Sequence, residues 1–331
     1  MQNLEKYYSG KNVLVTGGLG FIGSNLAHKL VQLKANIVLV DSLIPAYGGN
    51  LFNIHGIEGK VKANIADVRD ENSMNCLVKG QDCIFNLAGQ VSHLDSMIDP
   101  YTDLEINYRS QLSILEACRK NNDKAKILFA ATRSQYGKAC KLPVDENHPV
   151  RPTDINGINK TAGEWAHILY HNVYGIKACS LRLSNTFGPR HLMKHSKHEV
   201  LSWFIRLALD GQPITIYDEG KQLRDFNYVD DVVDAMLLAM ASDKTNGEIY
   251  NVGSGKGTQL VEAAKLCVKI AGKGSITHVP FPPEKKKIEI GDYIADIGKI
   301  RKTLDWEPKV GLEDGIKMTM DFFSKNRQHY W

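Results

Sequence analysis

Short apolar runs alternate with amphipathic stretches in the first part of the chain. The runs predict strands at 13–16, 37–40, 61–65, 83–87, 127–131 and 178–183. Between them, apolar residues spaced three or four positions apart predict helices at about 21–30, 71–78, 101–119 and 157–174. This alternation is typical of an α/β fold with a doubly wound parallel sheet, in which ligands gather at the carboxyl ends of the strands.

The periodic pattern loosens beyond Asn185, where prolines interrupt shorter elements. This change predicts a smaller C-terminal α/β lobe that closes over the sheet. We therefore expect a dinucleotide-binding domain at 1–184 with a return segment at about 229–254. The substrate lobe would then be formed by 185–228 and 255–331.

The first predicted strand stops at glycines spaced Gly17-x-x-Gly20-x-x-Gly23, and a helical pattern follows at once. Such a turn brings backbone N–H groups and the positive end of a helix close to a pyrophosphate, although glycines also occur in tight packing turns. The second strand ends at Asp41, 18 residues after Gly23 (41 − 23), near the spacing at which an acid meets the ribose. The pattern predicts a Rossmann-type site. Asp41 favours NAD over NADP because no Arg or Lys stands beside it to accept a 2′-phosphate.

The composition excludes several other classes of protein. The 331 residues are 24% charged and 43% hydrophobic, which is ordinary for a globular enzyme. A net charge of +4 is spread along the chain, and the one basic run, Lys285-Lys286-Lys287, is interpreted as a solvated loop. We therefore expect no nucleic-acid partner.

The six cysteines lie far apart, with no C-x-x-C pair and no metal-ligand spacing, so we expect free thiols in a reducing compartment and no metal site. The chain starts without a recognisable leader, and no segment approaches the ~20 apolar residues of a membrane span. These features predict a cytoplasmic enzyme without a membrane partner.

A set of ordered motifs extends along nearly the whole chain. They are Thr16-Gly-Gly-Leu-Gly-Phe-Ile-Gly23, Asp41, Asp67, Asn86-Leu-Ala-Gly-Gln90, Asn107, Thr132, Tyr136-Gly137, Arg182-Leu-Ser-Asn185 with Gly188-Pro189, and Arg224-Asp-Phe-Asn-Tyr-Val-Asp-Asp231. In this order they resemble the extended short-chain dehydrogenase/reductases, in particular the NAD-dependent nucleotide-sugar epimerases and dehydratases of the UDP-glucose 4-epimerase type.

The resemblance implies an NAD cofactor, a nucleotide diphosphate sugar as substrate, and a homodimer built on helices at about 100–120 and 157–174. It implies NAD-binding residues at Gly17, Gly20, Phe21, Ile22, Gly23, Asp41, Ser42, Asp67, Val68, Leu87, Ala88, Gly89, Gln90, Asn107 and Lys160. It implies substrate-binding residues at Ser92, Arg133, Ser134, Asn185 and Arg224.

In the family that this chain resembles, NAD oxidises a sugar C–OH group to a ketone. The carbon gives a hydride to NAD, and the hydroxyl gives its proton to a Tyr four residues before a Lys, beside a Ser or Thr. Thr132 and Lys160 match their places, but Asn156 stands where the Tyr belongs. An amide exchanges no proton near neutral pH, although it donates and accepts hydrogen bonds.

Three interpretations stay open at this point. Another group takes the proton, with Tyr136, His93 or a water held by Thr132 and Asn156 as candidates; a histidine titrates near neutrality. Alternatively, the reaction needs no strong base and Asn156 only orients the substrate. In the third interpretation, oxidation has been lost and the protein only binds its ligands.

The two residues after Thr132 help to choose between the reactions of the family. The 4,6-dehydratases that resemble this chain carry an Asp-Glu pair there, whereas this chain has Arg133 and Ser134. Without those carboxylates an epimerase is favoured, and a dehydratase is the enzymatic alternative. The planar fork of Arg133 suits an acidic sugar or a phosphate, or else an ion pair at the surface.

Asn185 and Arg224 match the positions expected to hold the substrate's diphosphate. The family commonly places an arginine near 289–292, where this chain has Glu289 and Asp292. Either Lys285 to Lys287 supply the positive charge or the nucleotide sits differently. The sequence thus predicts an NAD-dependent nucleotide-sugar epimerase of glycan precursor synthesis with an atypical active site.

Overall fold

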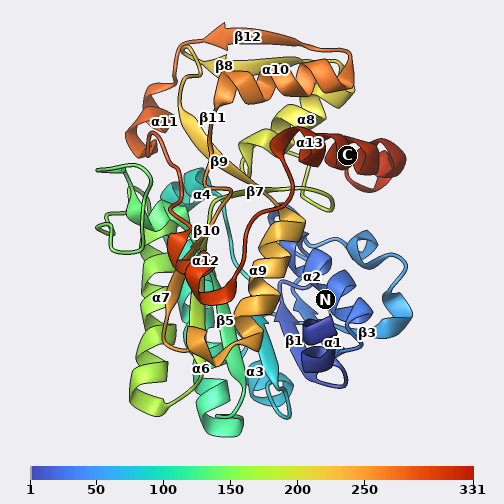
Figure 1. Ribbon diagram of the computed structural model, residues 1–331, viewed down its shortest axis with the longest axis vertical. Helices are drawn as coiled ribbons and strands as arrows, with labels where there is room; N and C mark the ends of the chain where they lie inside the picture. The colour runs from blue at the N-terminus through green and yellow to red at the C-terminus, as the bar shows by residue number, and fades with distance from the viewer. Residues whose placement is uncertain (1) are drawn as a thin grey trace.

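The computed structural model describes residues 2–331, and its largest element is a seven-stranded sheet (Figure 1). All neighbouring strands in this sheet run parallel, in the order β10-β6-β5-β4-β1-β2-β3. The strands are β1 (Asn12–Thr16), β2 (Asn36–Asp41), β3 (Val61–Ile65), β4 (Cys83–Asn86), β5 (Lys126–Thr132), β6 (Ala178–Leu183) and β10 (Ile249–Val252). The predicted doubly wound α/β fold is confirmed.

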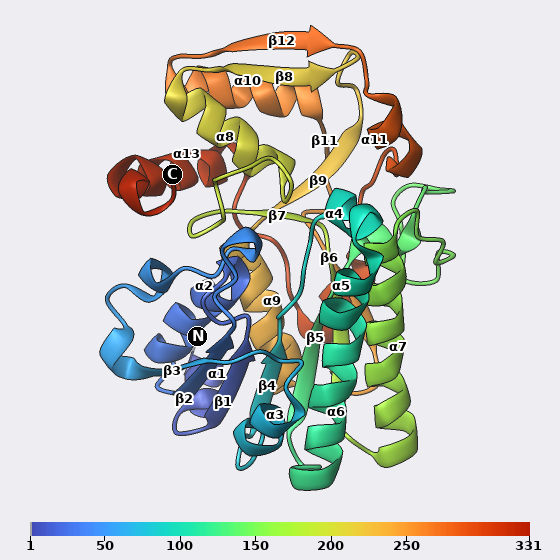
Figure 2. The ribbon, with the colours of Figure 1, turned by 180° about the vertical axis from the view of Figure 1, so that it is seen from behind.

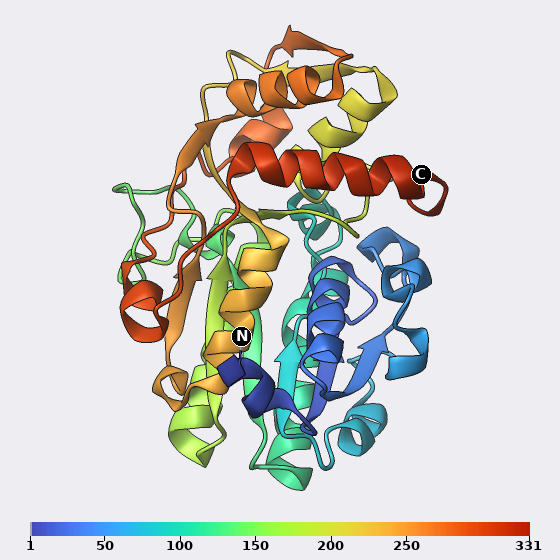
Figure 3. The same cartoon turned by 45° about the vertical axis from the view of Figure 1, so that its right-hand side comes forward.

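Helices cover both faces of this sheet, which explains why its strands are continuous apolar runs. On β1, Val13 and Val15 pack into one hydrophobic cluster and Leu14 into another. One face carries α1 (Gln2–Tyr8), α2 (Phe21–Gln32) and α9 (Val229–Ala241). The other carries α3 (Glu71–Leu77), α6 (Ser110–Asn121) and α7 (Ile155–Tyr174) (Figures 2 and 3).

The strand order reverses beside β1. The chain continues from β1 to β2 and β3 on one side, and then crosses to β4, which pairs with the other side of β1. A crevice opens at such a switch point because the connections leave in opposite directions. The fold therefore places the ends of β1 and β4 where a ligand can enter.

A smaller lobe lies beyond the carboxyl ends of the large sheet (Figure 1). It holds a three-stranded sheet of β7 (Asn185–Phe187), β9 (Leu223–Tyr228) and β11 (Gly257–Gln259), and a two-stranded sheet of β8 (Pro213–Tyr217) and β12 (Ser275–Val279). Its helices are α8 (Val200–Asp210), α10 (Leu260–Ala271), α11 (Pro283–Ile288) and α13 (Leu312–Asn326), and α12 (Gly298–Leu304) packs near β10. Helix α13 crosses the boundary between the two parts (Figure 3).

One predicted helix differs in detail. The helix expected at 101–119 is divided into α5 (Pro100–Leu104), a π-helical turn η4 (Glu105–Arg109) and α6. Between β2 and β3 the chain forms short 3₁₀ turns, η1 (Pro45–Tyr47), η2 (Leu51–Ile54) and η3 (Glu58–Lys60). Within residues 2–331, no helix has the length and apolar character needed to cross a membrane.

Candidate functional site

A cleft lies at the carboxyl edge of the large sheet, bounded on the far side by the segment 183–199. Its walls come from strand ends, from α4 (His93–Ile98) and from the start of α7. The predicted site residues that line it are Gly17, Gly20, Phe21, Ile22, Gly23, Asp41, Ser42, Asp67, Val68, Leu87, Ala88, Gly89, His93, Thr132, Arg133, Asn156, Lys160 and Asn185.

The glycine turn between β1 and α2 leaves no room for side chains. Gly17 has φ +65°, a conformation that L side chains rarely adopt. A Cβ on Gly23 would lie 2.2 Å from the Gly17 carbonyl oxygen. Gly20 is the N-cap of the twelve-residue α2, so the free N–H groups of that helix open on the cleft. This is a cradle that fits a pyrophosphate.

Two carboxylates stand beside the cradle. Asp41, at the end of β2, accepts backbone N–H groups from Leu19 at 3.1 Å and Leu43 at 2.9 Å. Burial raises the pKa of Asp41, and these backbone hydrogen bonds oppose the rise. Asp67 forms a two-pronged ion pair with Arg69, with Nε and Nη2 at 3.0 and 2.6 Å from Oδ2. Arg69 also lines the cleft and was missed from the sequence.

Lys160 presents a buried cation at the other end of the cleft. Its Nζ donates to the Ala130 carbonyl at 3.3 Å, and a Cβ on Gly89 would lie 2.8 Å from that nitrogen. Burial lowers the pKa of Lys160 to about 8, while the charge of Asp103 opposes the fall. The ammonium has donor capacity left for hydroxyls in the cleft, because it makes one hydrogen bond within residues 2–331.

Thr132, the last residue of β5, is held by a chain of polar contacts. Its backbone N–H donates to Gln135 Oε1 at 3.0 Å, and Gln135 Nε2 donates to Glu164 Oε1 at 3.1 Å. Glu164 is fully buried and pairs with Arg182. A rigid support of this kind fixes the Thr132 hydroxyl at the cleft wall.

Asn156 belongs to a buried amide cluster. Its Nδ2 donates to the Gln90 carbonyl at 2.8 Å and to Asp103 Oδ2 at 3.2 Å. The Asp103 carboxylate also accepts from Asn107 at 3.0 Å and from Asn159 at 2.8 Å. The π-helical turn contains Asn107, and the amides solvate a carboxylate that is 1% exposed.

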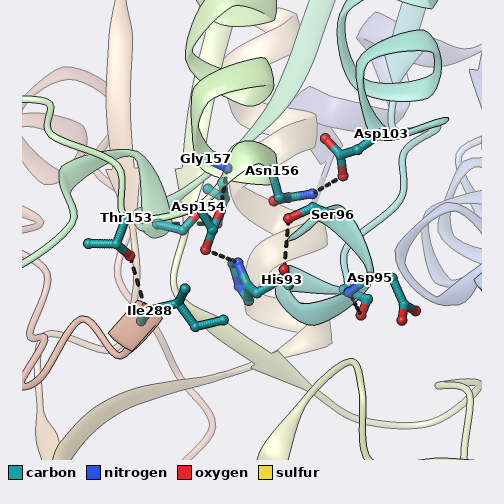
Figure 4. Close-up of polar contacts among 12 residues, drawn as sticks. His93, Asp95, Ser96, Asp103, Thr153, Asp154, Asn156, Gly157 and Ile288 are labelled. Carbon is teal, nitrogen blue, oxygen red and sulfur yellow. Dashed lines mark hydrogen bonds and ion pairs between the residues drawn. The ribbon is translucent and has the colours of Figure 1, made fainter. Parts of the chain in front are cut away.

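The side chains of His93 and Asp154 point toward each other, as Figure 4 shows. The distance from His93 Nδ1 to Asp154 Oδ2 is 2.7 Å, and the contact is bent away from a straight hydrogen bond. Asp154 Oδ1 accepts the Gly157 N–H at 2.7 Å and so caps α7. The sequence analysis missed Asp154. Its position before a helix, two residues from Asn156, was the available signal.

Arg133, like Lys160, is a cation of the cleft that has no carboxylate partner in an ion pair among the described residues. Its guanidinium lies 5.5 Å from the ring centre of Tyr293, and its Nη1 is buried without a hydrogen bond. Burial, together with the nearby charge of Arg224, lowers the pKa of Arg133 to about 10, so it stays charged at neutral pH. Buried charges are normally paired, so this end of the cleft suits an anion.

Two predicted residues do not line the cleft. Tyr136 is fully buried and donates to Asn251 Oδ1 at 2.6 Å, so it is removed from the candidates for the proton acceptor. Arg224 pairs with Glu289 at 2.6 Å, and its contact with a diphosphate stays a prediction. The charge of Glu289, unexplained from sequence, balances Arg224.

Four other predicted residues lie behind the lining instead of in it. Gln90 and Asn107 exchange hydrogen bonds at 3.2 and 3.0 Å and so support the wall. Ser92 caps α4 by accepting the Asp95 N–H, and Ser134 donates to Thr132 Oγ1 at 3.3 Å. Each is nearly or fully buried, which makes its contact with a ligand indirect.

Comparison with known proteins agrees with this geometry. A sequence profile of the NAD dependent epimerase/dehydratase family matches residues 13–253. The UDP-glucose 4-epimerase of Mycolicibacterium smegmatis is 32% identical over 321 residues, which are 95% of this chain and 99% of that protein. The UDP-N-acetyl-alpha-D-glucosaminuronate decarboxylase of Bacillus cytotoxicus is 32% identical over 326 residues, 95% and 98% of the two chains.

Among solved structures, the UDP-glucose 4-epimerase of Thermotoga maritima with UDP-glucose has a TM-score of 0.87 at 32% identity, covering 96% of this chain and 99% of that one. The chain belongs to the NAD-dependent epimerase/dehydratase family, and NAD is its cofactor. The glycine cradle, Asp41 and the buried cation Lys160 fit that cofactor. The chemistry that NAD supplies when bound is hydride transfer.

Proposed function

We propose that the protein is an NAD-dependent nucleotide-sugar epimerase of glycan precursor synthesis. One observation supports this choice within the family: the two residues after Thr132 are the cleft-lining Arg133 and the buried Ser134, and neither has a carboxylate side chain. Elimination of water needs an acid and a base at the outer carbon of the sugar. Oxidation and reduction of a hydroxyl need neither there, so epimerisation is favoured over 4,6-dehydration.

Residues of the cleft would bind and orient the cofactor and the substrate. Lys160 would hold the nicotinamide ribose through its remaining ammonium donors, and Thr132 would orient the reacting hydroxyl. Asn156 would add a hydrogen-bonding group to the same wall. Arg133 and Asn185 would hold an anionic part of the substrate, either its diphosphate or a carboxylate on the sugar.

An exposed apolar stripe supports a homodimer. On α7, Ile158, Trp165, Leu169 and Val173 are about half or more exposed, at spacings that place them on one side of the helix. Tyr101, on the neighbouring α5, is 79% exposed. Contiguous apolar surface of this kind marks an association site, and pairing α5, α6 and α7 with a second copy would cover it.

The decisive experiment is proton NMR of the protein with NAD and a panel of UDP-, GDP-, CDP- and dTDP-sugars in heavy water, including uronic acids. Epimerase activity predicts a second anomeric signal from a stereoisomer of the added sugar. A 4-keto-6-deoxy product would replace the proposal by a dehydratase. If no sugar of the panel gives a product signal although calorimetry shows binding, the protein only binds NAD and a nucleotide sugar. That alternative follows from Asn156, which stands where the family has its catalytic tyrosine.

A further inference from the structure

The missing tyrosine leaves the family's chemistry without its usual proton acceptor, and one pair of side chains in the cleft has the right properties. His93 begins α4, and its side chain is 38% exposed and lines the cleft with Thr132, Asn156 and Lys160. Asp154 precedes α7, and its side chain is 2% exposed. The two segments are far apart in sequence, and they meet at the cleft wall (Figure 4).

We propose that His93 is the proton acceptor and donor of this enzyme, and that Asp154 is the positioning residue that holds its imidazole. This inference rests on the proposed epimerase function and names the group that does the work of the absent tyrosine. It is carried by the 2.7 Å contact between His93 Nδ1 and Asp154 Oδ2 and by the exposure of the ring to the cleft.

The position and charge of Asp154 favour one assignment of the two ring nitrogens of His93. A carboxylate oxygen only accepts, so Asp154 favours the neutral tautomer with its proton on Nδ1. Nε2 would then be an unprotonated acceptor, and it makes no hydrogen bond within residues 2–331. Nδ1 itself is buried, which leaves Nε2 as the nitrogen available to a sugar hydroxyl.

Asp154 is suited to hold a ring that becomes positively charged. Burial by itself would raise the pKa of Asp154, but the hydrogen bond and charge of His93, the Gly157 N–H and the charge of Arg133 together bring it below its ordinary value. Asp154 therefore stays an anion beside the imidazolium. The bent contact can straighten when a substrate fills the cleft, as catalytic hydrogen bonds commonly do.

The proton and electrons balance over one cycle. Bound NAD would supply the place for the hydride of the sugar's C–H bond, while the O–H bond breaks, its proton passes to His93 Nε2, and a C=O bond forms. When the same hydride is given back to the other face of the ketone, His93 would return the proton to the oxygen. His93 ends the cycle neutral, and Asp154 gains and loses nothing.

Other charged groups lie near His93 and Asp154, and they also contribute to the pH dependence of turnover. Asp95, on the same helix, pairs with Lys197 at 2.9 Å. Arg133 acts on Asp154, and Lys160, His191, His198 and Glu199 line the same cleft. Comparison of variants with the wild type at each pH removes these common contributions.

The experiment measures turnover of the active sugar found in the NMR panel. His93→Gln should lower kcat by roughly 10²–10⁴-fold, the usual contribution of general acid–base catalysis. Asp154→Asn should lower it by about tenfold or more, because Asn caps a helix as well as Asp does but has no charge. His171→Gln, near the far end of α7, and Asp99→Asn, at the N-cap of α5, are the matched controls and should stay within about twofold.

Two further readouts distinguish chemistry from structure. Imidazole added to His93→Ala should restore turnover in proportion to its free-base form, which a structural role would not allow. In ¹⁵N-histidine spectra of the NAD-loaded wild type, a protonated Nδ1 signal of His93 should be present and should change in Asp154→Asn. Addition of UDP-glucose and UDP-glucuronate should move the Nε2 signal for the sugar that reacts.

The outcomes separate the two proposals. An active wild type with His93→Gln turning over within threefold, or with His93 protonated on Nε2 alone, would overturn the histidine–aspartate assignment and leave the epimerase standing. A wild type that is silent on the whole panel would overturn the epimerase, and the catalytic role of the pair with it. Lower turnover in His93→Gln and in Asp154→Asn, together with rescue of His93→Ala by imidazole, would support His93 as the proton acceptor and donor.

Discussion

Asn156, at the cleft wall, and the buried Asp103 lie 3.2 Å apart, Nδ2 to Oδ2. The amide at position 156 therefore has a structural task, because it is one of three asparagines that solvate a buried carboxylate. Asn156→Asp would place a second carboxylate against the first. We expect a loss of about 3 kcal/mol or more in the free energy of unfolding at neutral pH.

The pH dependence of that variant has a definite sign. Two carboxyls at this distance share a proton, so the folded state of Asn156→Asp binds more protons than the unfolded state. The loss should therefore be smaller at pH 5 than at pH 7. Urea unfolding at both pH values tests this, and an equal loss at the two would contradict the assigned cluster.

The lowered pKa of Lys160 predicts that the free energy of unfolding rises at alkaline pH. Its pKa is about 8 in the folded protein, against an ordinary 10.5 in the unfolded chain. Between these values the unfolded state binds more protons, so the free energy of unfolding increases with pH, by on the order of 2–3 kcal/mol. The difference between wild type and Lys160→Met, measured by chemical denaturation without NAD from pH 8 to 10, isolates this group. A difference between wild type and Lys160→Met that stays constant from pH 8 to 10 would contradict the lowered pKa of Lys160.

The glycine cradle makes a prediction for cofactor binding. In Gly23→Ala the added Cβ would meet the Gly17 carbonyl oxygen at 2.2 Å, so the turn has to open. We expect the affinity for NAD to fall by about 100-fold or more, by fluorescence titration. Gly59→Ala is the matched control, because its Cβ would have nothing within 4 Å, and its affinity should be unchanged. Equal effects would remove the cradle from the NAD site.

Arg133 should affect binding and stability in opposite directions. In Arg133→Gln an unpaired buried charge is lost, so the free energy of unfolding without ligand should stay the same or rise. Affinity for the nucleotide sugar should fall by about tenfold to 100-fold in calorimetry with NAD present. Comparison of UDP-glucose with UDP-glucuronate tells whether the guanidinium meets phosphate or a sugar carboxylate. Undiminished affinity for both would exclude an anion at this position.

The proposed homodimer is tested by two leucines of equal exposure. Leu169, on the apolar stripe of α7, is 55% exposed, and Leu51, on η2, is 57% exposed. Leu169→Asp should shift the protein to a monomer in size-exclusion chromatography with light scattering, since it buries a charge at the contact. Leu51→Asp should leave the mass unchanged. A monomeric wild type would refute the dimer itself.

The sequence by itself determined six strands of the large sheet, the helices between them and the glycine cradle. Their signals are local: a strand buried on both faces is a continuous apolar run, and a tight turn at Gly17 needs glycine. It also determined that Asp41 and Thr132 would share one cleft, because parallel strands end at one edge and the residues at their ends gather in space. Asn156 and Lys160 were placed in the same cleft by the resemblance to the family.

Only the tertiary structure decided which side chains pair across distant segments. The contacts of His93 with Asp154, of Arg224 with Glu289 and of Tyr136 with Asn251 each join residues tens of positions apart. No periodicity encodes such a pairing, because it depends on how helices and loops pack once the sheet has formed. For this reason the sequence could name both His93 and Tyr136 as candidates, and of these two side chains only His93 lines the cleft.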